Sequence, residues 1–136
     1  MKKLLTILSF VLIGSTVQAQ VMSAKPQWVE IKSANLRCWE CKEKLEKYLI
    51  VQNKGYLENA MAEWKFDLKN GIFKVKFFAD RASIEDIRAA LNNAGFDADN
   101  DKAEPEAYAK LPPICKRAED GGGPKPPKPC HIPPIQ

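Results

Sequence analysis

The strongest constraint on the fold is a pair of alternating segments that meet at Asn70-Gly71. Apolar residues alternate with charged ones on both sides of this dipeptide: Trp64, Phe66 and Leu68 before it, and Phe73, Val75 and Phe77 after it. Alternation at every second residue is typical of strands that bury one face. Asn-Gly often forms the turn between such strands, because both residues tolerate positive φ. The pattern therefore predicts an antiparallel β-hairpin.

Periodicity also predicts the elements on either side of the hairpin. The segment from Trp28 to Leu36 alternates and predicts a first strand that leads into a loop. Helical spacing then predicts an amphipathic helix from about Cys41 to Asn53-Lys54-Gly55. A second helix is expected from its N-cap, Ser83, to a C-cap at Gly95. A short return strand is expected at 96–98.

The resulting order is strand, helix, strand, strand, helix, strand. It predicts an α+β fold, the ferredoxin-like βαββαβ sandwich, with an antiparallel four-stranded sheet and two helices on one face. The expected domain organisation has five parts: a signal peptide at 1–19, an N-terminal linker at 20–27, the folded domain at 28–103, a C-terminal extension with Cys115 at 104–117, and a disordered Pro/Gly-rich tail at 118–136. Disorder is expected because such a tail buries too little apolar surface to offset its conformational entropy.

The N-terminal residues predict export. Lys2 and Lys3 precede an apolar stretch, and Val17-Gln18-Ala19 offers a small-residue cleavage site. The stretch is shorter than the roughly 20 residues of a membrane-spanning helix. We therefore expect a periplasmic or secreted monomer with no membrane span in the mature chain. Without the two leader lysines the formal charge falls from +4 to +2, which gives no reason to expect nucleic-acid binding.

The residues with the clearest chemistry are Cys38 and Cys41, at the boundary between the first loop and the first helix. Two thiolates at this spacing can bind one ion from opposite sides, and a helix N-terminus favours the thiolate form. Soft sulfur ligands favour Cu(I), and by the same argument Hg(II), over hard cations. Cys115 is a candidate third ligand, with a surface or disulfide cysteine as the alternative.

A closed Zn(II) site would need four ligands. The further candidates are Cys115, Cys130 and His131. Two of these three lie in the tail, where docking would cost conformational entropy. The sequence therefore argues against a closed site.

These features together resemble the heavy-metal-associated domain, a family that includes small copper chaperones and the periplasmic mercuric ion binding protein. The resemblance covers residues 28 to about 100 and rests on the cysteine pair, the Asn70-Gly71 hairpin, the second helix and Gly95-Phe96. Asn35-Leu36-Arg37 replaces the family's lead-in, which is Gly-Met-Thr or Gly-Met-His. Leu36 can fill the space of the family's Met. Arg37 is expected to add a positive charge beside the thiols.

The resemblance implies a metallochaperone or metal buffer. Cys38 and Cys41 would bind a soft metal ion, Cu(I) in the first place and Hg(II) or Zn(II) as alternatives, for delivery to a membrane metal transporter. The sequence shows no group of acid, base and nucleophile residues that would predict an enzyme. Its one histidine, His131, lies in the tail.

Two other functions use the same cysteine pair. An envelope thiol–disulfide oxidoreductase also carries Cys-x-x-Cys at a helix start. The hairpin at Asn70-Gly71, however, follows too soon for a thioredoxin-type domain. A third possibility is a protein-binding module that binds no metal and holds a structural Cys38–Cys41 disulfide.

Overall fold

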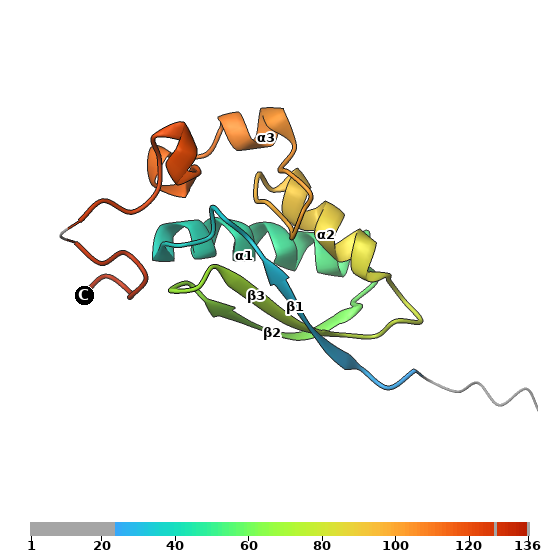
Figure 1. The fold of residues 1–136 in the computed structure, drawn as a ribbon. Coiled ribbons are helices and arrows are strands. Elements are labelled where there is room, and N and C mark those ends of the chain that lie inside the picture. The colour runs from blue at the N-terminus through green and yellow to red at the C-terminus, as the bar shows by residue number, and fades with distance from the viewer. Residues whose placement is uncertain (1–23, 127, 136) are drawn as a thin grey trace, which may run out of the picture.

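The computed structural model describes residues 24–126 and 128–135, so the expected signal peptide and half of the linker lie outside the described residues. The elements are β1 (Gln27–Lys32), α1 (Trp39–Lys54), β2 (Met61–Asp67), β3 (Ile72–Phe77), α2 (Ile84–Asn93) and α3 (Pro105–Ala109). Two 3-10 turns follow, η1 (Pro113–Cys115) and η2 (Ala118–Asp120). The α+β class is as predicted (Figure 1).

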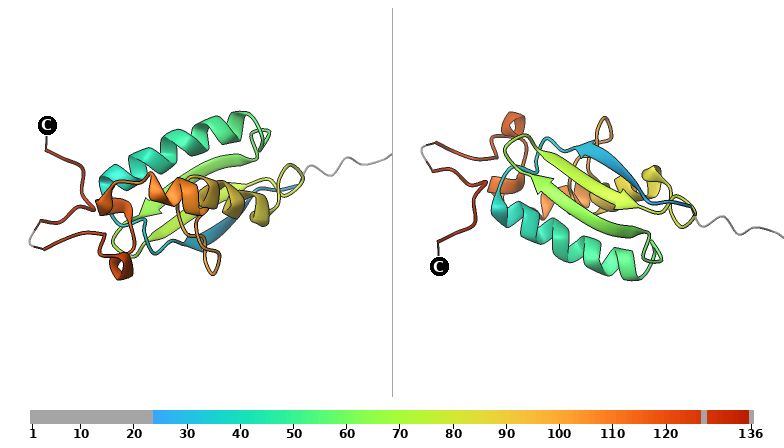
Figure 2. Two further views of the ribbon diagram at one scale, coloured as in Figure 1. Left: turned by 90° about the horizontal axis from the view of Figure 1, so that it is seen from above. Right: turned by 90° about the horizontal axis from the view of Figure 1, so that it is seen from below.

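The sheet is antiparallel and three-stranded, in the order β1-β3-β2. Ile31 of β1 and Phe66 of β2 both pair with Phe73 of the central strand. The residues of β3 alternate between buried and half-buried, which places Phe73 and Val75 on the covered face. Helices α1 and α2 cover this face, and no helix of the described part of the chain lies on the other face (Figure 2). The alternation of the sequence thus corresponds to one sheet face packed on helices.

The predicted fourth strand at 96–98 is wrong. Among the described residues after α2, the only pairing is an isolated bridge between Ala98 and Asp101. The backbone turns at Asp99, which has a positive φ of 55°. Its amide donates to the carbonyl of Lys32 at 2.7 Å, and its side chain accepts from the Lys32 amide at 2.9 Å. The segment therefore meets β1 at Lys32 and turns away, instead of adding a fourth strand to a ferredoxin-like sheet.

The predicted hairpin is confirmed, with a longer turn. Four residues, Leu68 to Gly71, connect β2 to β3. Gly71 has the positive φ, 66°, while Asn70 lies outside the left-handed region. Asn70 instead donates from its amide and its side chain to Asp67, at 3.2 and 2.8 Å. The turn is therefore an Asp-capped loop, not a two-residue Asn-Gly turn.

Both predicted helices are present. Helix α1 ends at Gly55, and Ser83 is the N-cap of α2. Asp86 and Ser83 form a reciprocal capping box, which explains why α2 begins where it does. The C-cap of α2 is Ala94, one residue before the predicted Gly95, whose φ of 93° turns the chain out of the helix. Within the described part of the chain, we find no helix with the length and apolar character needed to cross a bilayer.

The core lies between the sheet and the helices. Leu45 and Leu49 of α1 and Ile87 and Leu91 of α2 are completely buried. Leu36, in the connection between β1 and α1, is also completely buried, as the sequence predicts. This connection therefore lies against the core, and it carries the first cysteine to one end of the molecule.

Candidate functional site

The two cysteines of the Cys-x-x-Cys pair lie at the start of α1, as predicted. Cys38 is the N-cap residue, with extended backbone angles (φ −123°, ψ 152°), and Cys41 lies in the first turn. Both side chains are completely buried. The extended conformation of Cys38 lets the chain enter the helix from the core-lining connection that holds Leu36.

Both cysteines are disulfide-bonded in the structure. Cys38 forms a disulfide with Cys130, and Cys41 forms a disulfide with Cys115. The Cα–Cα distances are 4.6 and 5.4 Å, within the usual range for disulfides. The pair therefore does not present two free thiols that face one another, and it does not form a Cys38–Cys41 bond. Cys115, the candidate third ligand, lies at the predicted site as a partner of Cys41.

Asn35 holds the C-terminal chain against the connection between β1 and α1. Its side-chain amide donates to the carbonyl of Gly95 at 2.9 Å and to the carbonyl of Cys115 at 3.0 Å. Its side-chain oxygen accepts from the amide of Asp97 at 2.9 Å. Asn35 is 1% exposed, so these bonds are shielded from water. A polar residue three positions before Cys38 thus joins the cysteine loop, the end of α2 and Cys115.

A largely buried ion pair fixes the chain just beyond Cys115. The guanidinium of Arg117 donates to both carboxylate oxygens of Asp97, with Nε at 2.6 Å from Oδ2. The amide of Ala103 also donates to Asp97, at 2.9 Å. Burial alone would raise the pKa of Asp97, but the hydrogen bonds from Arg117 and Ala103 outweigh it, so its pKa lies below the usual value. Asp97 is therefore a carboxylate that anchors the C-terminal segment.

Cys130 reaches the start of α1 from the tail. Its carbonyl accepts a hydrogen bond of 2.6 Å from the amide of Trp39, the first residue of the helix. Figure 1 shows the C-terminal segment returning to this end of α1. Within the C-terminal segment, Ala118–Asp120 form a 3-10 turn and Cys130 is disulfide-bonded to Cys38.

The disulfide between Cys38 and Cys130 borders a hollow of about 580 Å³. Trp39 and Ile114 line this hollow together with the C-terminal residues Ile132 to Ile135. Cys130 is partly exposed, whereas Cys41 and Cys115 are completely buried. The two disulfides therefore differ in how readily a thiol from solution can reach them.

Arg37, in the loop that carries Cys38, contacts the turn of the hairpin. Its guanidinium donates to the carbonyls of Leu68 and Lys69, at 3.2 and 2.7 Å. These carbonyls belong to the turn between β2 and β3. Arg37 therefore ties the cysteine loop to the hairpin.

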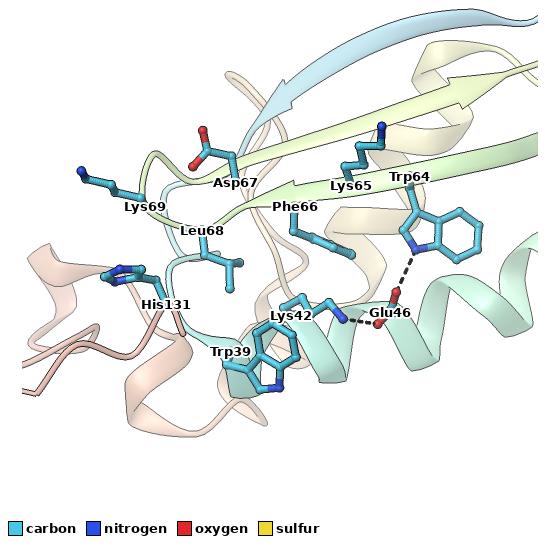
Figure 3. Close-up of a pocket in the computed structure, with 10 residues that line it drawn as sticks. All are labelled: Trp39, Lys42, Glu46, Trp64, Lys65, Phe66, Asp67, Leu68, Lys69 and His131. Carbon is cyan, nitrogen blue, oxygen red and sulfur yellow. Dashed lines mark hydrogen bonds and ion pairs between the residues drawn. The ribbon is translucent and has the colours of Figure 1, made fainter. Parts of the chain in front are cut away.

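A second hollow, of about 620 Å³, lies beside the same end of the molecule, between α1 and β2 (Figure 3). Glu46 accepts from Lys42 at 2.6 Å and from the indole of Trp64 at 3.1 Å. Burial alone would raise the pKa of Glu46, but these two bonds lower it overall. His131 lines this hollow near Leu68 and Lys69. Lys42 and Trp64 therefore both bond to Glu46 beside this hollow.

In the disulfide-bonded state, no three His, Cys, Asp or Glu side chains among residues 24–126 and 128–135 are grouped to hold a metal ion. Comparisons with protein-family models, curated proteins and solved structures gave no match. The resemblance to the heavy-metal-associated domain thus rests on this chain's own residues. Sequence reasoning missed Asn35, Asp97 and Arg117 as site residues, because a single polar residue carries no local signal of its distant partners.

Proposed function

We propose that this protein is an exported soft-metal-binding protein whose Cys38 and Cys41 bind a thiophilic ion once they are reduced. The observation that supports this most is the position of the pair: it follows β1 and begins α1 in a chain with the order β1-α1-β2-β3-α2. That order corresponds to the first five elements of a ferredoxin-like domain. We propose that the chain is a variant of this fold in which a turn at Asp99 replaces the fourth strand.

Thiolates, not disulfides, bind soft ions, so reduction must precede metal binding. One dithiol reductant per disulfide suffices: it transfers two electrons and two protons, releases two cysteine thiols and becomes a disulfide itself. The freed thiols lose protons as they bind the ion. Cu(I) is the ion that two soft ligands favour most, and Hg(II) and Zn(II) are alternatives. The disulfide-bonded form suits an oxidising compartment, such as the periplasm or the cell exterior.

The function of the bound state is to buffer the ion or to deliver it to a membrane metal transporter. The proposal includes no catalysis. Asn35 and Arg37, in the loop before Cys38, donate to backbone carbonyls and are not arranged around a reacting atom.

A second candidate function is thiol–disulfide exchange, which the accessible side of the Cys38–Cys130 bond favours. This disulfide lies at the N-cap of a 16-residue helix and borders an apolar hollow of about 580 Å³ that can receive a partner chain. A partner thiolate would attack one sulfur and form a mixed disulfide, and a second thiolate of the partner would resolve it.

A competition titration tests the metal-binding proposal. The mature chain is reduced, freed of reductant and titrated with Cu(I) against a chromogenic chelator. We expect the wild type to take up a tightly bound ion. In the double variant Cys38→Ser, Cys41→Ser the affinity should be lower by more than about 100-fold, because removing the ligands reduces metal affinity more than removing the groups that hydrogen-bond to ligands. Lys44→Ser, an exposed change on the same helix, serves as the control and should bind as the wild type does.

The disulfide-bonded protein is the second control and should take up no Cu(I). Reduced wild type that leaves all Cu(I) on the chelator contradicts the proposal. Catalysis of insulin reduction, without metal uptake, supports the oxidoreductase instead.

A further inference from the structure

We propose that reduction converts the two disulfides into one closed site, in which Cys38, Cys41, Cys115 and Cys130 together bind a single tetrahedral ion of the Zn(II) type. This inference rests on the proposed function, since it uses the same Cys38–Cys41 pair. It adds the other two ligands and the class of ion that four thiolates select. Zn(II) with four cysteines is a closed structural site, with no position left for an incoming ligand.

The first argument is that Cys115 is held in place independently of its disulfide. Its carbonyl accepts from the side chain of Asn35 at 3.0 Å, and its amide donates to the carbonyl of Pro112 at 2.9 Å. Two residues later, Arg117 pairs with the buried carboxylate of Asp97. None of these contacts involves sulfur. Cys115 should therefore stay beside Cys41 after reduction.

Cys130 also has an anchor that does not involve sulfur. The amide of Trp39 donates to its carbonyl at 2.6 Å, which fixes the backbone of Cys130 at the first turn of α1. This amide is one of the helix N-terminal donors that have no partner within the helix. The contact thus satisfies a donor that would otherwise need water. The entropic objection to tail ligands weakens accordingly, because the tail already lies on the domain.

The backbone separation within each pair suits two ligands of one ion. The Cα–Cα distances within the two disulfide pairs are 4.6 and 5.4 Å. A Zn–S bond is about 2.3 Å long, so two sulfurs on one tetrahedral ion lie about 3.8 Å apart. Sulfurs released from a bond of about 2 Å can reach this separation by side-chain rotation. Cys38 and Cys41, at the N-cap and in the first turn of α1, link the two pairs.

The charge of such a site also fits its position. Four thiolates and one divalent ion have a net charge of −2, and the site lies at the N-terminus of α1, whose dipole stabilises negative charge. Disulfide formation consumes all four sulfurs, which explains why the oxidised state holds no metal-binding group in the described residues. Binding and oxidation are therefore mutually exclusive states of one cluster. A closed site would make the protein a redox-controlled buffer, not a donor that passes ions on readily.

Co(II), a spectroscopic substitute for Zn(II), tests the number of thiolate ligands. Reduced mature protein is titrated with Co(II), and the sulfur-to-cobalt charge-transfer absorption and the ligand-field bands are recorded. Four thiolates in a tetrahedral site should give the full charge-transfer intensity and strong ligand-field bands at one equivalent. Zn(II) should then displace the Co(II).

Variants identify the ligands. Cys115→Ser and Cys130→Ser should each lower the charge-transfer intensity by about a quarter and weaken Zn(II) binding by more than about 10-fold, with more than about 100-fold for the double variant. Lys128→Ser, on the same segment, is the matched control and should change neither quantity. Circular dichroism of each reduced variant, with and without metal, shows whether the domain is folded. An unfolded Cys115 variant leaves Cys130→Ser as the decisive test.

The outcomes separate this inference from the proposed function. If the double variant Cys115→Ser, Cys130→Ser binds with unchanged affinity and spectrum, the four-thiolate site is refuted while metal binding by Cys38 and Cys41 stands. If reduced wild type binds neither Cu(I) nor Co(II), both proposals fail. An intensity that falls stepwise with each of the four cysteines supports both.

Discussion

At the residue scale, Asn35 is a buried junction between segments that lie far apart in the sequence. In the sequence, Asn35 is the first of the three residues before Cys38, a segment that only loosely resembles the corresponding segment of the heavy-metal-associated family. In the structure it joins three segments through buried hydrogen bonds to Gly95, Asp97 and Cys115. A residue with a short amide side chain can both donate and accept, which is why Asn can serve as this junction.

Replacement of Asn35 by Ala should therefore destabilise the protein. The change leaves buried carbonyl and amide groups without partners, at a cost of at least about 2 kcal/mol. Urea unfolding of the disulfide-bonded chain measures the loss. Asn93→Ala, at an exposed position of α2, is the matched control and should change stability by less than about 0.5 kcal/mol. Equal effects of the two changes would mean that the junction carries no stability.

At the scale of elements, the hairpin supports the cysteine loop. Gly71, in the turn between β2 and β3, accepts from the amide of Ser33 at 2.8 Å. Arg37 reaches the same turn from the loop that carries Cys38. A Cβ at Gly71 would lie 2.6 Å from the carbonyl oxygen of Ser33 and 3.0 Å from Cδ of Arg37. Glycine is needed here both for the positive φ and for this close approach.

The change Gly71→Ala should cost more than about 2 kcal/mol, since strain from the positive φ adds to a clash with backbone. Gly121 offers a sharp control, because its φ is also positive, 77°, but apart from its chain neighbours no atom of the described residues lies within 4 Å of a Cβ built there. Gly121→Ala should thus cost only about 1 kcal/mol, the strain alone. Thermal unfolding of the two variants compares them. A smaller loss at position 71 than at position 121 would contradict the role assigned to the turn.

The elements also show where local signals were sufficient and where they were not. The alternation around the hairpin and the capping pair Ser83 and Asp86 act over a few residues, so β2, β3 and the start of α2 could be predicted. The apolar residues of the segment 96–98, after Gly95, predict a strand. Asp97 instead accepts hydrogen bonds from Ala103 and Arg117. These contacts with later parts of the chain turn the backbone away from β1.

At the scale of the whole molecule, two disulfides and the ion pair between Asp97 and Arg117 attach the C-terminal segment to the rest of the fold. Asp97 is 3% exposed and pairs with Arg117, so its carboxylate contributes to stability in its charged form. Its pKa is lower in the folded state than in the unfolded chain, where the ordinary value is about 3.9. The folded state therefore binds fewer protons at this residue than the unfolded state does. The contribution is complete well above pH 4 and is lost as the pH falls through the folded-state pKa.

We accordingly expect the free energy of unfolding to decrease from pH 7 to pH 3, in part through Asp97. Other carboxylates with lowered pKa, among them Asp86 and Asp120, contribute to the same trend. The variant Asp97→Asn isolates the effect of Asp97. It should be less stable than wild type at pH 7, and the difference should shrink as the pH falls. Urea titrations at several pH values measure it, and a constant difference across this range would show that Asp97 is not the group involved.

The sequence by itself determined the β-hairpin, the two main helices and the position of Cys38 and Cys41 at a helix start. These features follow from hydrophobic period and capping chemistry, which act over a few neighbouring residues. Only the tertiary structure decided the number of strands and the partners of the cysteines. The two disulfides join residues 92 and 74 positions apart. The pairing of the four cysteines depends on the contacts that Asn35, Asp97 and Trp39 make with the C-terminal chain. No local sequence pattern encodes these contacts.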